Sequence, residues 1–541
     1  TWAILLAVGY ALYRRFVIKP PGVGRSSDAV LVLAFTGALM LSIICMNLFH
    51  ILDARPEYAG SFFITNHLAG LFAGSEMTSE TAHTVFTTFK WLHMILVLGF
   101  SMYIPNSKHL HIVAAGPNTF FRNLDREKPM TVIDFTNESL TQYGAAKVTD
   151  LNWKDNLDLY SCTECGRCQD LCPAWNTDKP LSPKRLIMDL KDNLYRNKEA
   201  ALAHNYDAVT PLIDHKVTPD VIWACTTCRA CEIACPVFIN QTDKIYESRR
   251  NLVMMESSFP AEVQAVFKNM ETNASPWAFS AADRANWAEG LDVKTVAEQP
   301  EMDVLLWVGC AGSFDDRNKR VVRSFVNLLK KADIKFSILG TEEQCTGDSA
   351  RRIGNEYLFQ TLAQANIETM NRYAVKRIVT ACPHCFNTLK NEYKDFGGNY
   401  EVFHHSDFLA RLIKEGKLKS TKKVAEEVTF HDSCYLGRWN NIYDQPREIL
   451  ESIPGMKLTE MKSHHDQSMC CGAGGGRMWM EETIGKRINV VRTEQALQTG
   501  AKVIAASCPF CMTMMNDGVK AHDKQDSVRV MDIAEVLDQA T

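Results

Sequence analysis

Two stretches of the sequence, CTECGRCQDLCP at residues 162–173 and CTTCRACEIACP at residues 225–236, decide the fold. Each has the spacing CxxCxxCxxxCP, which is the cysteine run of bacterial two-cluster ferredoxins. Three cysteines of a run hold one [4Fe-4S] cubane, and the fourth, which precedes a proline, ligates the other cluster. The motif therefore predicts one cubane on Cys162, Cys165, Cys168 and Cys235, and another on Cys225, Cys228, Cys231 and Cys172.

Disulfides and zinc are the rival explanations for the 18 cysteines of this chain. A chain of 541 residues with 46% hydrophobic content needs no disulfide framework to bury a core. Zinc is satisfied by four ligands and does not call for a three-plus-one pattern closed by proline. Iron-sulfur clusters are thus favoured over both. The 52 residues between the runs have a helical pattern, so we expect an α-helical ferredoxin domain at residues 159–260.

The C-terminal half of the sequence is an internal repeat. Cys310 and Cys434 are 124 residues apart, Cys345 and Cys470 are 125 apart, and the closing CxxC pairs are 126 apart. Near-constant offsets indicate a duplicated module, which we place at residues 301–420 and 421–541, after a connector at residues 261–300. In each copy, β-like runs that end at cysteines alternate with amphipathic helices. This predicts α/β layers with the cysteines at the carboxyl edge of a sheet.

The second copy resembles the CCG domain of heterodisulfide reductase catalytic subunits, because Cys434 is followed by a Cys-Cys-Gly triplet and then by CPFC. The resemblance implies a catalytic noncubane [4Fe-4S] cluster held by five thiolates, from Cys434, Cys470, Cys471, Cys508 and Cys511. The first copy departs from this pattern, since Thr346 stands where the second copy has Cys471. The sequence leaves open whether its four cysteines bind a cluster or belong to a bare structural copy. These are Cys310, Cys345, Cys382 and Cys385.

A glycine-rich stretch follows the paired cysteines, with the sequence GAGGGRMW at residues 472–479. It lacks the GK[ST] ending of a phosphate loop and does not follow a strand, so we expect its glycines to let the backbone approach the cluster sulfurs. The chain has no dinucleotide fingerprint, which argues that an external carrier exchanges electrons with it. A net charge of −4 gives no global basic surface, and we expect no nucleic-acid partner.

The first 120 residues have the composition of a membrane region. Residues 29–52 carry no Asp, Glu, Lys or Arg and exceed the roughly 20 apolar residues that a span requires. Residues 86–105 form a second candidate, and residues 2–18 read as the end of a third span that begins upstream of this sequence. A polar linker at residues 121–158 follows. Basic residues flank the spans, namely Arg14, Arg15, Lys19, Arg25, Lys108, Arg122, Arg126 and Lys128.

This charge bias predicts a multi-pass protein of the inner membrane whose iron-sulfur domains face the cytoplasm. Within the region, His93 and His111 are 18 residues apart, which on one continuous helix returns to the same face about 27 Å along. Such a pair suits two stacked b-haems. It is equally compatible with one interfacial histidine and one helix contact, and the spacing does not decide between them.

The last span and the sequence IPNSKHLHIVAAGPNTFF resemble the terminal helix of nitrate-reductase-type cytochrome b subunits. This resemblance implies that His93 and His111 each bind one b-haem, with partner ligands on a helix upstream of residue 1. Nearly the whole chain resembles fusions of such a membrane part with heterodisulfide-reductase-like iron-sulfur domains. GCAGSFDDR, CTGDSARRIGNEYLFQ and CPHCFNTLKNEY carry that resemblance most specifically.

The fold class expected is therefore a multidomain chain with an α-helical cytochrome b part, a two-cluster ferredoxin domain and duplicated CCG domains. Several such fusions look like electron-transferring flavoprotein:menaquinone oxidoreductases. The resemblance implies an oxidoreductase with reduced flavoprotein as donor and menaquinone as acceptor. Two alternatives stay open: a quinol-dependent disulfide or trisulfide reductase, and a relay subunit of a larger respiratory complex.

Overall fold

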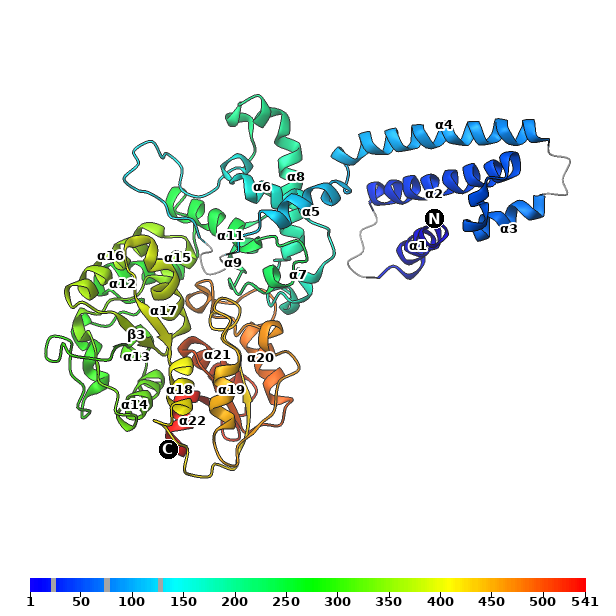
Figure 1. Ribbon diagram of the computed structural model, residues 1–541. Helices are drawn as coiled ribbons and strands as arrows, with labels where there is room; N and C mark the ends of the chain where they lie inside the picture. Colours follow the sequence, from blue (N-terminus) through cyan, green and yellow to red (C-terminus); the bar gives the residue numbers. More distant parts are fainter. Residues whose placement is uncertain (21–25, 73–77, 125–129) are drawn as a thin grey trace. The chain divides into compact units, whose positions relative to one another are not determined.

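The computed structural model describes residues 1–20, 26–72, 78–124 and 130–541 (Figure 1). These residues divide into two compact units, Thr1–Phe120 and Phe121–Thr541. The first unit is helical, and its main helices begin at side-chain caps. Ser26 accepts a hydrogen bond from the backbone N–H of Ala29, and Thr78 accepts one from Thr81. The helices are α1 Trp2–Tyr13, α2 Ser27–Ala54, α3 Phe63–Phe72, α4 Ser79–Tyr103 and α5 Leu110–Phe120.

Two segments of the first unit are long and apolar enough to cross a membrane, α2 and the stretch Ser79–Asn106 that contains α4. They pack side by side, with the rings of Phe35 and Phe100 stacked at 5.2 Å. The expected partial span at residues 2–18 forms α1 and a short π-helix, Arg14–Ile18. Three of the basic residues counted in the charge bias lie outside the described residues, Arg25, Arg126 and Lys128.

The prediction of one helix running from His93 to His111 is wrong. Helix α4 ends at Tyr103 and gives way to a 3-10 turn at Ile104–Asn106, before α5 begins at Leu110. Pro105 lies in that turn and has no backbone N–H to continue the helix. His93 and His111 therefore lie on different helices, and their 18-residue spacing does not place them on one helix face.

The second unit begins with the ferredoxin-like part, which is helical as predicted. A buried ammonium group ties two of its helices together, because Lys244 on α11 pairs with Asp155 and Asp158 on α6. The helices are α6 Trp153–Ser161, α7 Arg167–Asp170, α8 Pro183–Leu202, α9 Pro219–Trp223, α10 Ala230–Ile233, α11 Gln241–Arg250 and α12 Ala261–Asn273.

The rest of the unit contains two four-stranded parallel sheets with the same strand order, which confirms the duplication. The first sheet has the order β2-β1-β3-β4 and the second β6-β5-β7-β8. Parallel strands buried on both faces read as continuous apolar runs, as in β1 and β7. The strands are β1 Val304–Trp307, β2 Phe336–Ser337, β3 Arg377–Thr380, β4 Glu401–His404, β5 Glu427–Phe430, β6 Lys457–Leu458, β7 Val503–Ala506 and β8 Arg529–Asp532.

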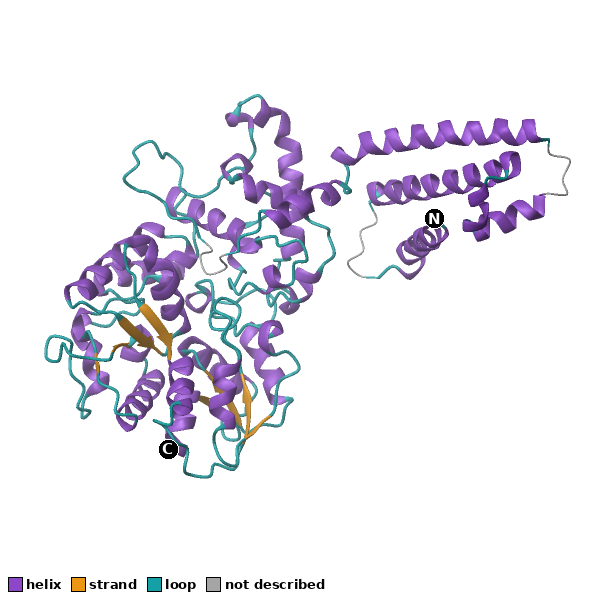
Figure 2. Cartoon of the chain, in the orientation of Figure 1, coloured by secondary structure: helices purple, strands orange, loops and turns teal. Residues whose placement is uncertain are grey.

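Helices surround both sheets (Figure 2). The strand order reverses at the centre of each sheet, between β1 and β3 and between β5 and β7, and ligands of open α/β sheets bind at such switch points. The helices of the first copy are α13 Gly309–Phe314, α14 Asp316–Lys331, α15 Asp348–Ile353, α16 Glu356–Arg372, α17 Pro383–Asn387 and α18 His405–Lys414. Those of the second copy are α19 Asp444–Glu451, α20 Ile488–Leu497, α21 Pro509–Ala521 and α22 Ile533–Ala540.

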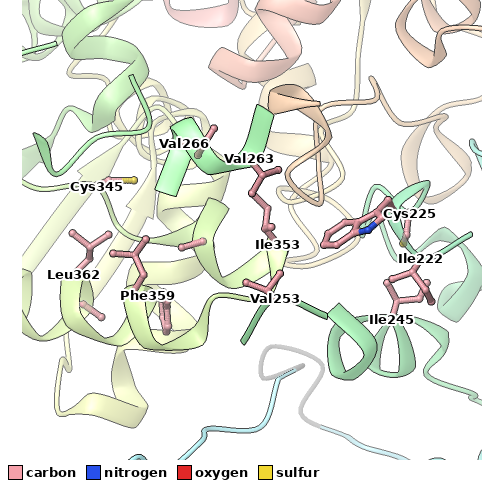
Figure 3. Packing of buried hydrophobic residues seen from close by; sticks show 14 of the residues in the cluster. Ile222, Cys225, Ile245, Val253, Val263, Val266, Cys345, Ile353, Phe359 and Leu362 are labelled. Carbon is pink, nitrogen blue, oxygen red and sulfur yellow. The ribbon is translucent and has the colours of Figure 1, made fainter. Parts of the chain in front are cut away.

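The ferredoxin-like part shares hydrophobic cores with both copies. One core joins Ile222 and Ile245 to Ile353 and Phe359 of the first copy (Figure 3). Another core joins Tyr246 of the ferredoxin-like part to Tyr435 and Trp439 of the second copy. The cysteine runs are therefore held in fixed positions relative to the sheets of both copies.

Candidate iron-sulfur sites

The two ferredoxin runs have the same backbone path. Glu164 and Thr227 occupy equivalent positions and both have positive φ, and so do Gly166 and Arg229. The N–H of Thr227 donates to Cys225 Sγ at 3.3 Å, which turns the chain around the sulfur. Of the eight cysteines, Cys165 is exposed and the rest are buried.

The structure sorts these cysteines into the two groups that ligand exchange requires. Burial, together with the neighbouring thiols of Cys162, Cys235 and Cys165, raises the pKa of Cys168 to about 12. The pKa of Cys172 is raised by burial and by a different pair of thiols, from Cys228 and Cys225. We call these sets the Cys162 group (Cys162, Cys165, Cys168 and Cys235) and the Cys225 group (Cys172, Cys225, Cys228 and Cys231).

The five cysteines of the second copy also converge. Cys511 Sγ donates to Cys471 Sγ at 3.3 Å, and Cys470 contacts both Cys471 and Cys434. Cys508 precedes helix α21 and contacts Cys511 in its first turn. Hydrogen bonds from Cys470 and Cys511 lower the pKa of Cys471 to about 5, so a thiolate is accessible there. We call this set the second-copy group (Cys434, Cys470, Cys471, Cys508 and Cys511).

The four cysteines of the first copy form a similar but smaller set, the first-copy group (Cys310, Cys345, Cys382 and Cys385). Cys310 contacts Cys345, Cys382 contacts Cys385, and Thr346 Oγ1 lies 3.8 Å from Cys385 Sγ. All four thiols line a mainly apolar cavity of about 30 Å³, which Phe510 of the second copy also lines. Thr346 therefore contacts the sulfur of Cys385, as expected from its equivalence to Cys471 in the second copy.

The second-copy group lies directly against the Cys225 group. Cys470 contacts Cys228, and this contact, together with burial, raises the pKa of Cys228. Three side chains that follow Cys434 hold the same ferredoxin loop. Tyr435 Oη is 3.0 Å from Thr227 Oγ1, Arg438 Nε donates to the carbonyl of Cys228 at 2.6 Å, and Trp439 Nε1 donates to that of Thr227 at 3.1 Å.

The glycine-rich stretch has two roles. The N–H of Gly472 donates to Cys470 Sγ at 3.3 Å, so the backbone approaches a sulfur as expected. A Cβ at Gly474 or Gly475 would overlap the carbonyl oxygens of Thr226 and Cys225, respectively. The glycines therefore also admit the ferredoxin loop, a second role that the sequence alone does not reveal.

Three buried arginines show that this site suits an anionic group. Arg249, Arg438 and Arg492 make no ion pair with a carboxylate among the described residues. Their charges act on cysteine thiols: Arg249 on Cys225, Arg438 on Cys228, Cys434 and Cys470, and Arg492, which Asp432 also influences, on Cys471 and Cys511. A buried cation is costly unless it is paired, and thiolate-bound clusters are anionic. The donor set and the surrounding charge thus both fit iron-sulfur clusters.

Sequence reasoning missed Arg438, Tyr435 and Trp439, although the phrase YLGRWN directly after Cys434 offered a signal.

The histidines expected to bind haem are held by hydrogen bonds through Nδ1. His93 Nδ1 is 2.9 Å from Ser42 Oγ on α2, and His111 Nδ1 is 2.7 Å from the carbonyl of Lys108. In both rings Nε2 is left as the atom for metal binding, and an Nδ1 contact of this kind is common in metal-ligating histidines. Each of the two histidines is individually suited to be a haem ligand, but they do not lie on the same helix.

Comparisons with known proteins agree with the domains that contain these cysteines. The pattern of the CCG family, described as a cysteine-rich domain, matches residues 304–390 and 428–516, and that of a 4Fe-4S dicluster domain matches residues 158–239.

Similar proteins cover more of the chain. It is 42% identical to "Probable iron-sulfur-binding oxidoreductase FadF" of Bacillus subtilis (strain 168), a match that covers 100% of this chain and 82% of that protein. It is 44% identical to "EtfAB:quinone oxidoreductase" of Syntrophomonas wolfei subsp. wolfei, over 83% of this chain and 67% of that protein. Identity to one component of the dihydromethanophenazine:CoB--CoM heterodisulfide reductase of Methanosarcina mazei is 31%, over 71% of this chain and 94% of that protein.

Proposed function

We propose a function from one premise: the chain belongs to the family of iron-sulfur oxidoreductases that includes the matched proteins of Bacillus subtilis and Syntrophomonas wolfei. It is accordingly an oxidoreductase that transfers electrons. We propose further that its donor is reduced electron-transferring flavoprotein and its acceptor menaquinone. Clusters on the cysteine groups supply one-electron transfer, with potentials that proteins tune across about a volt.

The observation that carries the proposal is the contact between Cys470 and Cys228. It joins the second-copy group to the Cys225 group through side chains, without an intervening layer of protein. Cys168 and Cys172 then belong to different groups although they lie four residues apart on one run, and so do Cys231 and Cys235. The sites therefore follow one another in the order second-copy group, Cys225 group, Cys162 group.

The surface is reached at the end of that order, where Cys165 is exposed. An electron that enters at the second-copy group leaves from the Cys162 group. We propose that the flavoprotein docks on the CCG domains, and that the Cys162 group passes electrons on toward the quinone.

We propose that α2 and α4 anchor the chain in the inner membrane as part of a multi-pass region, with the iron-sulfur domains on the cytoplasmic side. One relative with 37% identity is named "Probable membrane-anchored ferredoxin", which supports an anchor. We also propose His93 and His111 as ligands of b-type haem, because each has Nδ1 fixed by a hydrogen bond. Pyridine haemochrome spectra of the wild type, His93→Ala and His111→Ala proteins test this assignment, and unchanged haem content in both variants would exclude it.

We propose that the first-copy group also binds an iron-sulfur cluster. Its support is the convergence of four buried thiols around an apolar cavity. The cluster would differ from that of the second copy because Thr346 replaces the fifth thiol.

The test of the function is stopped-flow reduction of the full-length protein by reduced electron-transferring flavoprotein, followed at the iron-sulfur and haem bands with a menaquinone analogue present. We expect rapid reduction and reoxidation by the quinone. The similarity to a heterodisulfide reductase component motivates the alternative outcome. If the flavoprotein fails to reduce the protein, and quinol reduces it while a disulfide reoxidises it, the protein is a disulfide reductase.

A further inference from the structure

Among the three arginines that lack a carboxylate partner in the described part of the chain, Arg438 is the one whose charge acts on two cysteine groups at once. Its guanidinium is held by three carbonyl oxygens: Nε binds that of Cys228 at 2.6 Å, and Nη1 binds those of Asp466 at 3.0 Å and Ser468 at 2.6 Å. Nη2 is buried and has no hydrogen-bond partner among the described residues. The position of the charge is therefore fixed, with donor capacity left over.

No carboxylate of the described chain forms an ion pair with the Arg438 guanidinium, although Glu232 and Asp243 line a cavity with it. The thiols on which Arg438 acts are Cys228 of the Cys225 group and Cys434 and Cys470 of the second-copy group. Other buried arginines differ in this respect. Arg447, which lies in the same copy, pairs with Asp432 at 2.8 Å and with Glu460 at 2.6 Å.

Arg492 provides a second fixed charge, but on one group alone. It acts on Cys471 and Cys511, and its Nε donates to His431 Nδ1 at 3.0 Å. The carboxylate of Asp432 also acts on the Arg492 charge, although both of its oxygens accept hydrogen bonds from Arg447.

An arginine side chain stays protonated in proteins, and reduction adds negative charge to an anionic centre. A fixed, buried positive charge beside such a centre therefore stabilises its reduced form and raises its reduction potential. The effect is strong in a buried site, where the effective dielectric is low and salt does not screen the charge.

We propose that Arg438 is a positioning residue that shares one fixed positive charge between the second-copy group and the Cys225 group, and so holds the potentials of both centres high together. The inference depends on clusters in these two groups and is independent of the electron donor and acceptor. Because one charge serves both centres, its removal shifts both potentials in the same direction and leaves the difference between them little changed.

The experiment is an EPR-monitored redox titration of the purified holoprotein with dithionite and mediators, so that neither flavoprotein nor quinone is needed. The variants are Arg438→Gln, Arg438→Lys, Arg492→Gln and, as the carboxylate-paired control, Arg447→Gln. Iron content is measured for each. We expect Arg438→Gln to lower the reduction potentials of both the second-copy centre and the Cys225 centre. The expected change is about tenfold in the equilibrium constant for reduction, which is about 59 mV for a one-electron couple.

The remaining expectations separate charge from packing. Arg438→Lys keeps the charge, so its potentials and iron content stay closer to wild type than those of Arg438→Gln. Arg492→Gln lowers the second-copy potential alone, and the Cys162 centre is unchanged in every variant. Equal shifts in the Lys and Gln variants, a shift of one centre alone in Arg438→Gln, or an equal loss of iron in both Arg438 variants would overturn the proposal. Loss of flavoprotein-dependent reduction with these potentials intact would instead contradict the proposed donor.

Discussion

The two CCG copies have the same sheet and almost the same cysteine positions, yet they differ in charge and in contacts. The second copy has five thiols, a glycine loop against the ferredoxin run, and two arginines without a carboxylate partner among the described residues. The first copy has four thiols, and the arginine that acts on Cys310 and Cys345, Arg284, pairs with Glu343 at 3.1 Å. Duplication kept the framework of the site and left the second copy with a direct cysteine contact to the ferredoxin part.

Further differences appear at equivalent positions. Where the second copy has Ala473 and Phe510, the first has Asp348 and His384, whose side chains pair at 2.9 Å. His384 stacks on Tyr435 of the second copy at 4.0 Å and meets the edge of Phe510 at 5.2 Å. The first copy thus supports the second by packing. Four predictions test this division of roles.

The largest effect is expected from equivalent cysteine substitutions. Cys470→Ser removes the thiol that contacts Cys228, so reduction by the flavoprotein should fall to background. Cys345→Ser, at the same position of the first copy, should lose iron from that copy while most of the rate remains, because the contact with the ferredoxin loop is intact. Stopped-flow rates and iron content measure both. A loss of rate in Cys345→Ser as complete as in Cys470→Ser would show that the two copies act as one site.

Exchanging the residue that distinguishes the cysteine sets should exchange their spectra. Thr346→Cys supplies the fifth thiol to the first copy, next to Cys385. We expect it to add a second signal of the kind seen from the second copy, and Cys471→Thr to abolish the original one. EPR and Mössbauer spectra of the reduced proteins provide the measurement. An unchanged spectrum in Thr346→Cys would mean that charge and shape, and not the number of thiols, set the cluster type.

The glycine loop gives the next effect. Gly475 has φ of 65°, and a Cβ there would overlap the carbonyl of Cys225. Gly500 also has positive φ, 77°, but a Cβ there meets no atom within 4 Å. Gly500→Ala should cost about 1 kcal/mol from backbone strain, whereas Gly475→Ala should cost about 3 kcal/mol or more and slow internal electron transfer. Thermal melting and reduction kinetics compare the pair. Equal destabilisation would remove the close approach as the reason for glycine.

The sequence predicted much of this arrangement and missed the rest for physical reasons. The CxxCxxCxxxCP runs and the constant repeat offsets depend on short-range geometry, so the helical ferredoxin part and the duplicated sheets were predictable. The contact of Cys470 with Cys228 joins residues 242 positions apart and has no sequence signature. The uncompensated charge of Arg438 likewise depends on which of the described carboxylates lie around it. The continuous helix from His93 to His111 failed because periodicity was carried through Pro105.

The smallest effect concerns the Asp348–His384 pair. Burial raises the pKa of Asp348, but His384 and Arg352 outweigh burial and lower it from 3.8 to about 2. A carboxylate whose pKa is lowered by folding stabilises the fold at pH values above its pKa in the unfolded chain. This stabilisation, about 2 kcal/mol, is lost as the pH falls from about 4 to 2. Asp348→Ala/His384→Phe restores the second-copy residues and removes this dependence. Burial lowers the pKa of His384, but the charge of Asp348 outweighs burial and raises it above 6.5, so the stability from the charged pair is lost again as the pH rises through that raised value. We therefore expect the variant and the wild type to differ most in melting temperature at about pH 5 to 6 and to converge in acid. Asp432→Asn removes the carboxylate of the Asp432–Arg447 ion pair in the second copy, and this variant serves as the control. A constant difference between variant and wild type from pH 7 to pH 3 would show that the pair acts by packing on Tyr435 and Phe510 alone.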